Sequence, residues 1–335
     1  MANFSRLRPK RMIAVMPWWA LSSAQVDILV QRPLDKTRQN SKSTGRGLRV
    51  CSSERTNALF AGRLLHSEKP APSLEFIETT CRDPQGAPTL FIHGAFAGAW
   101  MWGESFLPHF GARGRFAAAV SLRGHGGSEG RSRSPTAGLA DYLADVTRAI
   151  SEFHEPPIIV AHSLGALLAQ RLLGEVKIRA LVMLAPLPPE GLLFLGPWLL
   201  ATRPRTWLEM AKVTLGLSNS REGRKDGARH VVFANQFSPE EARRYAALMV
   251  AEGLRALMEA HLPYPVISAH FLRIPSLVIA GADDPLIGCV TTMRTAAYHA
   301  AQHISAGGVG HLMLIGPGAD GTARRVLEWI EQNGL

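Results

Sequence analysis

A serine at position 163 stands between an apolar run, Pro157 to Val160, and a helix-like stretch, Ala166 to Leu173. A tight turn from strand to helix forces its central residue into strained backbone angles. Such a turn tolerates only small residues two positions before and two after, and Ala161 and Gly165 meet that need. The usual G-x-S-x-G pattern has glycine where this chain has Ala161. The sequence therefore predicts a strand, a sharp turn that exposes the Ser163 hydroxyl, and a helix.

A serine hydroxyl is a weak nucleophile and needs a base, which an acid in turn orients. The acid candidates are Asp283 and Asp284, which follow the short apolar run Ser276 to Gly281. The base candidate is His311, which follows a glycine-rich stretch shortly before a final helix from Gly321 to Gln332. The order nucleophile, acid, histidine along the chain is typical of one group of hydrolytic enzymes.

Upstream, the apolar run Thr89 to Ile92 leads into a loop that is rich in small residues, His93 to Gly98. Small residues let backbone N–H groups approach a ligand closely. We expect the amides of Ala95 and Leu164 to bind an oxyanion, because preorganised N–H groups stabilise developing negative charge.

Taken together, these segments resemble the α/β-hydrolase superfamily from about Leu74 to Asn333, nearly four fifths of the chain. The motifs that carry the resemblance are the His93-Gly94 loop followed by Trp100 and Trp102, the turn Arg123-Gly124-His125-Gly126-Gly127-Ser128, the Ser163 turn, Gly281-x-x-Asp284 and Gly310-His311. In that family the acid lies three residues after the glycine that ends its strand, which favours Asp284 over Asp283. The family's frequent proline a few residues later is absent, since Leu286-Ile287-Gly288 stands there.

The resemblance implies acyl transfer in two steps, in which Ser163 attacks, His311 moves the proton and Asp284 orients the imidazole. A serine at 163 argues against the family's dehalogenases and epoxide hydrolases, which attack with aspartate. We expect a carboxylesterase or lipase-like enzyme acting on a small, apolar acyl substrate. Thioester cleavage, lactone opening and carbon–carbon bond hydrolysis remain alternatives, as does a catalytically silent member that binds a ligand.

The order of elements predicts an α/β fold with a mostly parallel central sheet covered by helices on both faces. A chain of 335 residues, 46% hydrophobic, is long enough for one such core and an inserted subdomain. Functional groups of such sheets gather at the carboxyl ends of the strands. The strand candidates are Leu74–Thr80, Thr89–Ile92, Ala117–Ser121, Ile158–His162, Ala180–Ala185, Ser276–Gly281 and Gln302–Ser305, with helices expected at Ala140–Phe153 and Ala166–Leu173.

From about Pro188 to Ala269 the alternation stops and only helices are expected, which indicates a helical cap. Ser238-Pro239-Glu240-Glu241 has the form of a capping box with proline at the first helical position, and we expect it to open a long helix through about His261. The apolar stretch Gly191 to Leu200 is too short to span a bilayer. We interpret it chiefly as packing between cap and main domain, with an acyl pocket or a lipid contact as alternatives.

Residues 1–70 carry 13 Lys or Arg against 4 Asp or Glu, which is +9 of the chain's net +10. We interpret this segment as a solvated, poorly ordered extension. Arg6 to Arg11, the apolar run Met12 to Leu21 and Ser22-Ser23-Ala24 also fit a secretion signal, and a misassigned start fits equally well. We favour the cytoplasm over export. The basic residues lack aromatic interleaving, so no nucleic-acid partner is expected.

Neither metal nor cofactor is indicated. Cys51, Cys81 and Cys289 are widely spaced and show no ligand pattern. No stretch reaches the roughly 18 apolar residues of a transmembrane helix. The sequence indicates no oligomeric state. We interpret His93, His125 and His162 as structural residues that hydrogen-bond to loops.

Overall fold

The computed structural model describes residues 71–81, 83–130, 136–214 and 237–335. The expectations about the N-terminal extension and its signal-like segment fall outside these residues. The described residues belong to one compact unit, 68–335.

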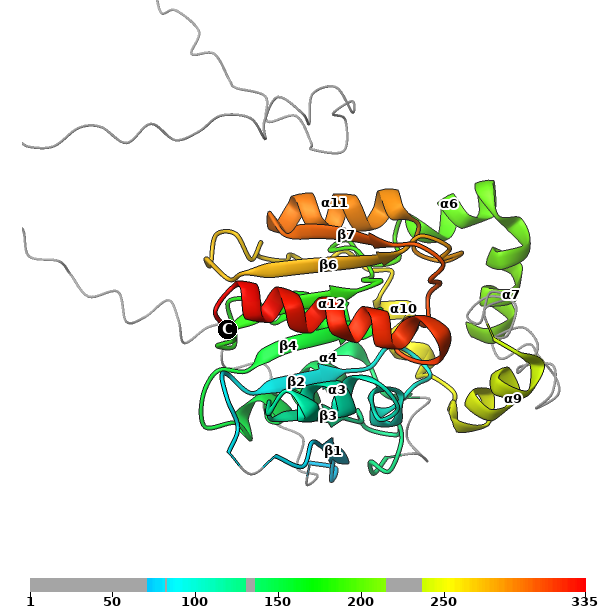
Figure 1. The fold of residues 1–335 in the computed structure, drawn as a ribbon. Helices are drawn as coiled ribbons and strands as arrows, with labels where there is room; N and C mark the ends of the chain where they lie inside the picture. Colours follow the sequence, from blue (N-terminus) through cyan, green and yellow to red (C-terminus); the bar gives the residue numbers. More distant parts are fainter. Residues whose placement is uncertain (1–70, 82, 131–135, 215–236) are drawn as a thin grey trace, which may run out of the picture. The chain divides into compact units, whose positions relative to one another are not determined.

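A seven-stranded sheet organises this unit, in the order β1-β3-β2-β4-β5-β6-β7 (Figure 1). Only β1 is antiparallel to its neighbour, β3. The remaining pairs are parallel, so their carboxyl ends share one edge. All seven predicted strands are confirmed with ends within two residues, as β1 Phe76–Glu78, β2 Thr89–Ile92, β3 Ala117–Val120, β4 Ile158–His162, β5 Ala180–Leu184, β6 Ser276–Gly281 and β7 Gln302–Ala306.

Both faces of the sheet are buried, which explains why its central strands are continuous apolar runs. Successive side chains of a strand point to opposite faces. Phe91 of β2 therefore joins one core cluster, with residues of α3 (Phe106–Ala112) and α12 (Ala319–Gln332). Leu90 and Ile92 join a second cluster, with residues of α4 (Leu139–Ser151), α5 (Leu164–Arg171) and α11 (Cys289–His299). The predicted α/β fold, with helices on both faces, is confirmed.

A long connection joins β5 to β6, although these two strands are direct neighbours in the sheet. Its described part contains helices and no strand: α6 Leu195–Thr202, α7 Pro204–Thr214, α9 Pro239–Leu248 and α10 Leu254–Glu259. Within α6, Leu195 and Leu199 are buried, whereas Trp198 is 41% exposed. The apolar stretch that contains α6 thus packs only on one side. Its role as part of a cap stays a prediction.

The predicted single long helix from Ser238 to about His261 is wrong, because the structure has two helices there, α9 and α10, with a break between them. The capping box is present, with the Ser238 hydroxyl accepting the Glu241 amide at 3.2 Å. The helix ends at Leu248, however, because Met249 turns extended with ψ 143° and the Val250 amide donates to the Phe96 carbonyl at 3.0 Å. A second helix, α10, begins only after Gly253. Contacts with the main domain therefore interrupt the helix.

Candidate active site

Ser163 occupies the turn between β4 and α5 with φ 50° and ψ −115°. A positive φ is costly for a residue with a Cβ and persists only where the surroundings impose it. The Ser163 amide donates to the Leu184 carbonyl at 3.0 Å, which fixes the turn against the neighbouring strand. Gly165 is needed because a Cβ there would lie 2.4 Å from the His93 carbonyl oxygen. The backbone thus takes the strained form that the sequence predicts.

We expect Gly165→Ala to lower the free energy of unfolding by about 3 kcal/mol, the upper end for overpacking a core. The added methyl group would meet two backbone carbonyls, of His93 and Ile92, which cannot move aside as a side chain can. Urea unfolding measures the change. Gly307→Ala is the matched control, because nothing lies within 4 Å of its added Cβ, and it should change stability by less than about 0.5 kcal/mol. Equal midpoints for the two variants would contradict the argument.

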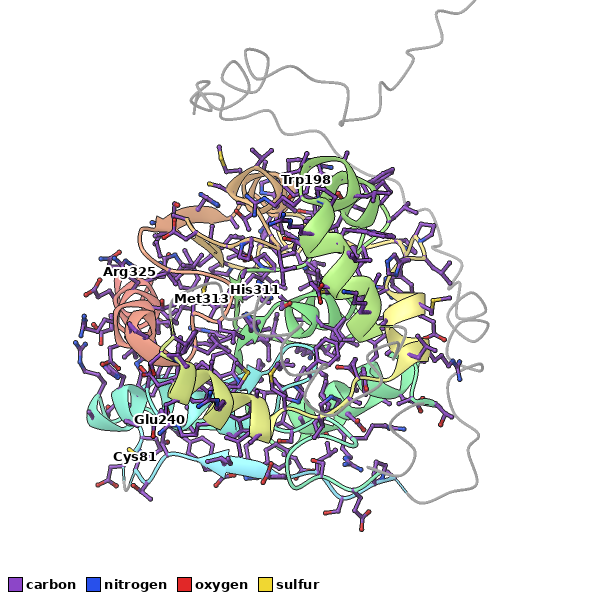
Figure 2. All side chains as sticks on the ribbon, turned by 90° about the vertical axis from the view of Figure 1, so that its right-hand side faces the viewer. Cys81, Trp198, Glu240, His311, Met313 and Arg325 are labelled. Carbon is purple, nitrogen blue, oxygen red and sulfur yellow. The ribbon has the colours of Figure 1, made fainter. Side chains whose placement is uncertain are left out.

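His311 lies between Ser163 and Asp284, and all three follow the carboxyl ends of strands. Its Nε2 is 3.1 Å from the Ser163 Oγ, and its Nδ1 is 2.8 Å from Asp284 Oδ2. The other Asp284 oxygen accepts the amides of Leu286 and Ile287 at 2.8 and 3.0 Å. Figure 2 views the molecule from the side that carries α6, α7 and α9, and His311 lies near the middle of that view. Asp283 is exposed, whereas Asp284 is 2% exposed.

Two further histidines hold the surrounding loops. His162 Nε2 donates to the His311 carbonyl at 2.9 Å, and His93 Nε2 accepts the Leu122 amide at 3.0 Å. Burial lowers the pKa of each to about 3, and a neighbouring histidine adds to the effect in each case. Both imidazoles are therefore neutral at physiological pH and act as fixed hydrogen-bonding groups.

These buried histidines predict a loss of stability in acid. Their folded pKa lies below the unfolded value of about 6.5, so the unfolded state takes up protons first. Their contribution to the free energy of unfolding is complete above pH 6.5. It is lost as the pH falls from 6.5 toward 3, at up to about 1.4 kcal/mol per pH unit for each group. In thermal unfolding from pH 7.5 to 5, His162→Gln should show a shallower fall in Tm than the wild type. Parallel curves would contradict the assignment.

The loop that carries Ala95 lies directly against the serine turn. A Cβ on Gly94 would meet His162 Nδ1 at 2.8 Å and the Ser163 Cβ at 3.0 Å, so only glycine permits this approach. Leu164 is the first residue of α5, where backbone amides lack partners within the helix. Within the described residues, neither the Ala95 nor the Leu164 amide donates one of the loop hydrogen bonds. Their proposed oxyanion role is compatible with this arrangement.

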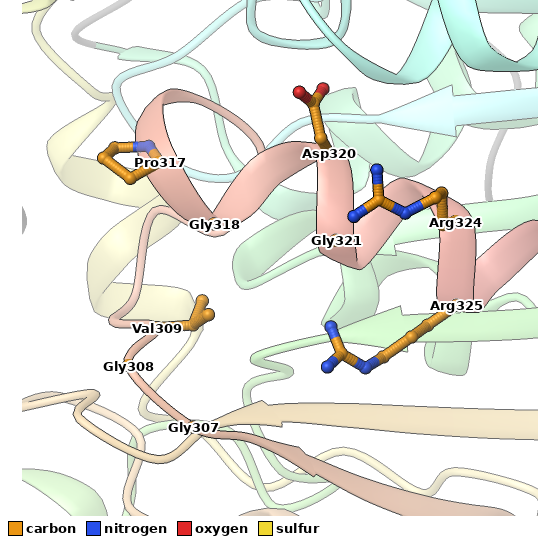
Figure 3. Close-up of a pocket in the computed structure, with 9 residues that line it drawn as sticks. All are labelled: Gly307, Gly308, Val309, Pro317, Gly318, Asp320, Gly321, Arg324 and Arg325. Carbon is orange, nitrogen blue, oxygen red and sulfur yellow. The ribbon is translucent and has the colours of Figure 1, made fainter.

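A pocket of about 400 Å³ lies between residues 307–309, which precede His311, and the first turns of α12. Gly307 and Gly308 line it on one side, and Arg324 and Arg325 of α12 line it on the other (Figure 3). None of Ser163, Asp284 and His311 contributes to its wall, so it is separate from the candidate active site.

Sequence reasoning missed a buried carboxylate, Glu252, beside the Ala95 loop. It lies between α9 and α10 and contacts His125 and Tyr142, which are more than 100 positions away in the chain. The one local signal is Gly253, a helix breaker within the predicted helix.

Two classes of feature are absent from the described residues. No helix there is long and apolar enough to cross a membrane. Within the same ranges, no group of three or more His, Cys, Asp or Glu side chains is placed to hold a metal ion.

A family model described as "Alpha/beta hydrolase family" matches residues 89–324, so the chain belongs to that family. A comparison with the curated proteins gives no significant match.

Several solved structures share the fold. The monoacylglycerol lipase of Paleococcus ferrophilus is 18% identical with a TM-score of 0.55, and the match covers 77% of this chain and 98% of the lipase chain. A thermophilic esterase from Thermogutta terrifontis is 16% identical with a TM-score of 0.56, covering 78% and 94%. The epoxide hydrolase VrEH1 from Vigna radiata is 18% identical with a TM-score of 0.57, covering 78% and 95%. Because these proteins are named for different reactions, the shared fold alone does not define the chemistry.

Proposed function

We propose that the chain is a serine hydrolase that cleaves esters, with Ser163 as nucleophile, His311 as general base and Asp284 as the acid that orients it. The observation that carries the proposal is the continuous chain of contacts from Ser163 Oγ through His311 to Asp284 Oδ2, at 3.1 and 2.8 Å. Both distances are within hydrogen-bond reach, which proton transfer from Ser163 to His311 and orientation of His311 by Asp284 require. The family membership and the lipase and esterase of similar fold support this direction.

In the proposed mechanism, His311 accepts the Ser163 proton as Oγ attacks the substrate carbonyl. Asp284 keeps the imidazole in the tautomer with a protonated Nδ1 and stabilises the cation that forms. The Ala95 and Leu164 amides bind the oxyanion. His311 then protonates the leaving alcohol, and water activated by the same imidazole hydrolyses the acyl-enzyme.

We also propose that the segment from about 188 to 269 is a cap over this site. Two contacts support the proposal. Arg203, just after α6, donates from Nη1 to the Asp284 carbonyl at 3.3 Å. Glu252 accepts the Phe96 amide at 3.1 Å. The segment thus contacts the loops of both the acid and the predicted oxyanion hole.

The test is hydrolysis of p-nitrophenyl esters from acetyl to palmitoyl by the full chain, before and after treatment with a fluorophosphonate. Turnover that the fluorophosphonate abolishes would support a serine esterase, and the preferred chain length would measure the acyl pocket. Absence of turnover on every ester would contradict the ester substrate. It would favour a thioester, lactone or carbon–carbon substrate, or a silent binding protein.

A further inference from the structure

Glu252 is a buried carboxylate whose two oxygens both accept hydrogen bonds. It is 8% exposed. Its Oε2 accepts the Phe96 amide at 3.1 Å and lies 3.3 Å from His125 Nε2, with which it forms an ion pair when the imidazole is protonated. Its Oε1 accepts the Gly253 amide at 2.9 Å and the Tyr142 hydroxyl. The carboxylate therefore joins the break between α9 and α10 to three separate parts of the main domain.

Phe96 is held at both of its backbone polar groups by this same short segment. Its amide donates to Glu252, and its carbonyl accepts the Val250 amide at 3.0 Å. Phe96 has φ 65°, a left-handed conformation that a residue with a side chain adopts only when its surroundings enforce it. The two hydrogen bonds supply that enforcement one residue after Ala95.

The charges around Glu252 keep it ionised. Burial alone would raise its pKa, but His125 and the hydrogen bonds lower it to about 2. Burial also opposes the charge on His125, yet Glu252 outweighs this and raises the His125 pKa. The neutral His93 ring lies 5.1 Å from the His125 ring, and the Asp145 carboxylate, which also favours a charged His125, is paired with Arg123 at 2.8 Å. An ionised carboxylate accepts a hydrogen bond more strongly than a neutral group, so the Phe96 amide is firmly held.

We propose that Glu252 is a positioning residue of the oxyanion hole, which holds the Phe96 amide and thereby aims the adjacent Ala95 amide toward the Ser163 turn. The proposal rests on the proposed function. Glu252 does not touch the reacting atoms. Its effect passes through the backbone of Phe96, and it links the segment between β5 and β6 to the transition-state contacts of the main domain.

The test compares Glu252→Ala and Glu252→Gln with Tyr142→Phe as matched control. Glu252→Ala removes every hydrogen bond of the carboxylate. Glu252→Gln keeps the shape but has one carbonyl oxygen for the Phe96 and Gly253 amides, which now bind different oxygens. Tyr142→Phe removes a hydrogen bond to Glu252 and leaves the Phe96 bond intact. The readouts are kcat and KM for a p-nitrophenyl ester, Tm, and amide hydrogen exchange of the peptide that contains residues 93–97.

We expect Glu252→Ala to lower kcat about 100-fold and Glu252→Gln about 10-fold, with KM within about twofold, because a small misplacement of an oxyanion donor affects mainly the transition state. Exchange in the 93–97 peptide should rise in both variants. Tyr142→Phe should keep kcat within about twofold and leave that peptide unchanged. If Glu252→Ala does not fold, Glu252→Gln decides the result.

Wild-type kcat in Glu252→Gln would overturn the proposal, as would an equal loss in Tyr142→Phe, which would indicate a general structural role. If the wild type itself shows no serine-dependent turnover, the proposed function fails and exchange alone decides about Glu252. Faster exchange of the 93–97 peptide in Glu252→Gln but not in Tyr142→Phe would retain Glu252 as the residue that holds the loop, and unchanged exchange in Glu252→Gln would overturn the proposal.

Discussion

Ser163→Ala should lower kcat for ester hydrolysis by about 10⁵- to 10⁶-fold, because removing the nucleophile of such a triad removes covalent catalysis entirely. The Oγ has its only proposed proton acceptor, His311 Nε2, at 3.1 Å, and alanine leaves this base without a partner. Steady-state kinetics with the best p-nitrophenyl ester measures the loss. Covalent labelling by a fluorophosphonate should vanish with it, and mass spectrometry should place the wild-type adduct on Ser163.

Ser151→Ala is the matched control for this variant. Ser151 is an exposed serine at the end of α4, whose hydroxyl donates to the Arg148 carbonyl at 2.7 Å. The same loss of one hydroxyl there should leave turnover and labelling as in the wild type. Full turnover in Ser163→Ala would rule out this serine as the nucleophile.

Asp284→Asn should lower kcat about 10⁴-fold, the effect known for the equivalent substitution in other triads of this kind. Asp284 Oδ1 accepts two backbone amides, of Leu286 and Ile287, so the asparagine carbonyl would take that place. Its NH₂ would then face His311 Nδ1 and hold the imidazole in the tautomer with a protonated Nε2. Such an imidazole cannot accept the Ser163 proton. Kinetics from pH 6 to 9 would measure the effect.

Asp283→Asn provides the control, since Asp283 precedes Asp284 directly but is exposed. We expect kcat within about twofold of the wild type. A larger loss in Asp283→Asn than in Asp284→Asn would move the acid by one residue and contradict the orientation of His311 described above.

The sheet could be predicted from the sequence because its strands are buried on both faces. Burial on both faces makes runs such as Ile158 to Ala161 in β4 apolar throughout, and glycine marks the end of Ser276–Gly281. The choice of Asp284 over Asp283 came from family spacing. In the structure Asp284, and not Asp283, contacts His311. Local patterns thus located the strands and the candidate residues that follow their ends.

The break between α9 and α10 could not be predicted in the same way. Apart from Gly253, residues 239–261 have the local pattern of one helix. The helix is ended by a set of long-range contacts, from Val250 and Glu252 to Phe96 and from Glu252 to His125. A local pattern gives no information on which distant groups will meet. The role that we propose for Glu252 could therefore not be inferred from the sequence, because only the fold brings these residues together.

The connection between β5 and β6 leaves the sheet after β5 and rejoins it at the adjacent strand, β6. In the pairing of these two strands, Leu181 lies opposite Ser276. Because the two strands are parallel, the connection leaves from the carboxyl end of β5 and returns at the amino end of β6. The strand pairing fixes the positions of both ends whatever lies between them, and a longer excursion costs little extra loop entropy. A whole segment could therefore be exchanged at this connection while the proposed nucleophile, acid and base stay in place. Any such graft into this chain must keep an acceptor for the Phe96 amide, or supply a new one.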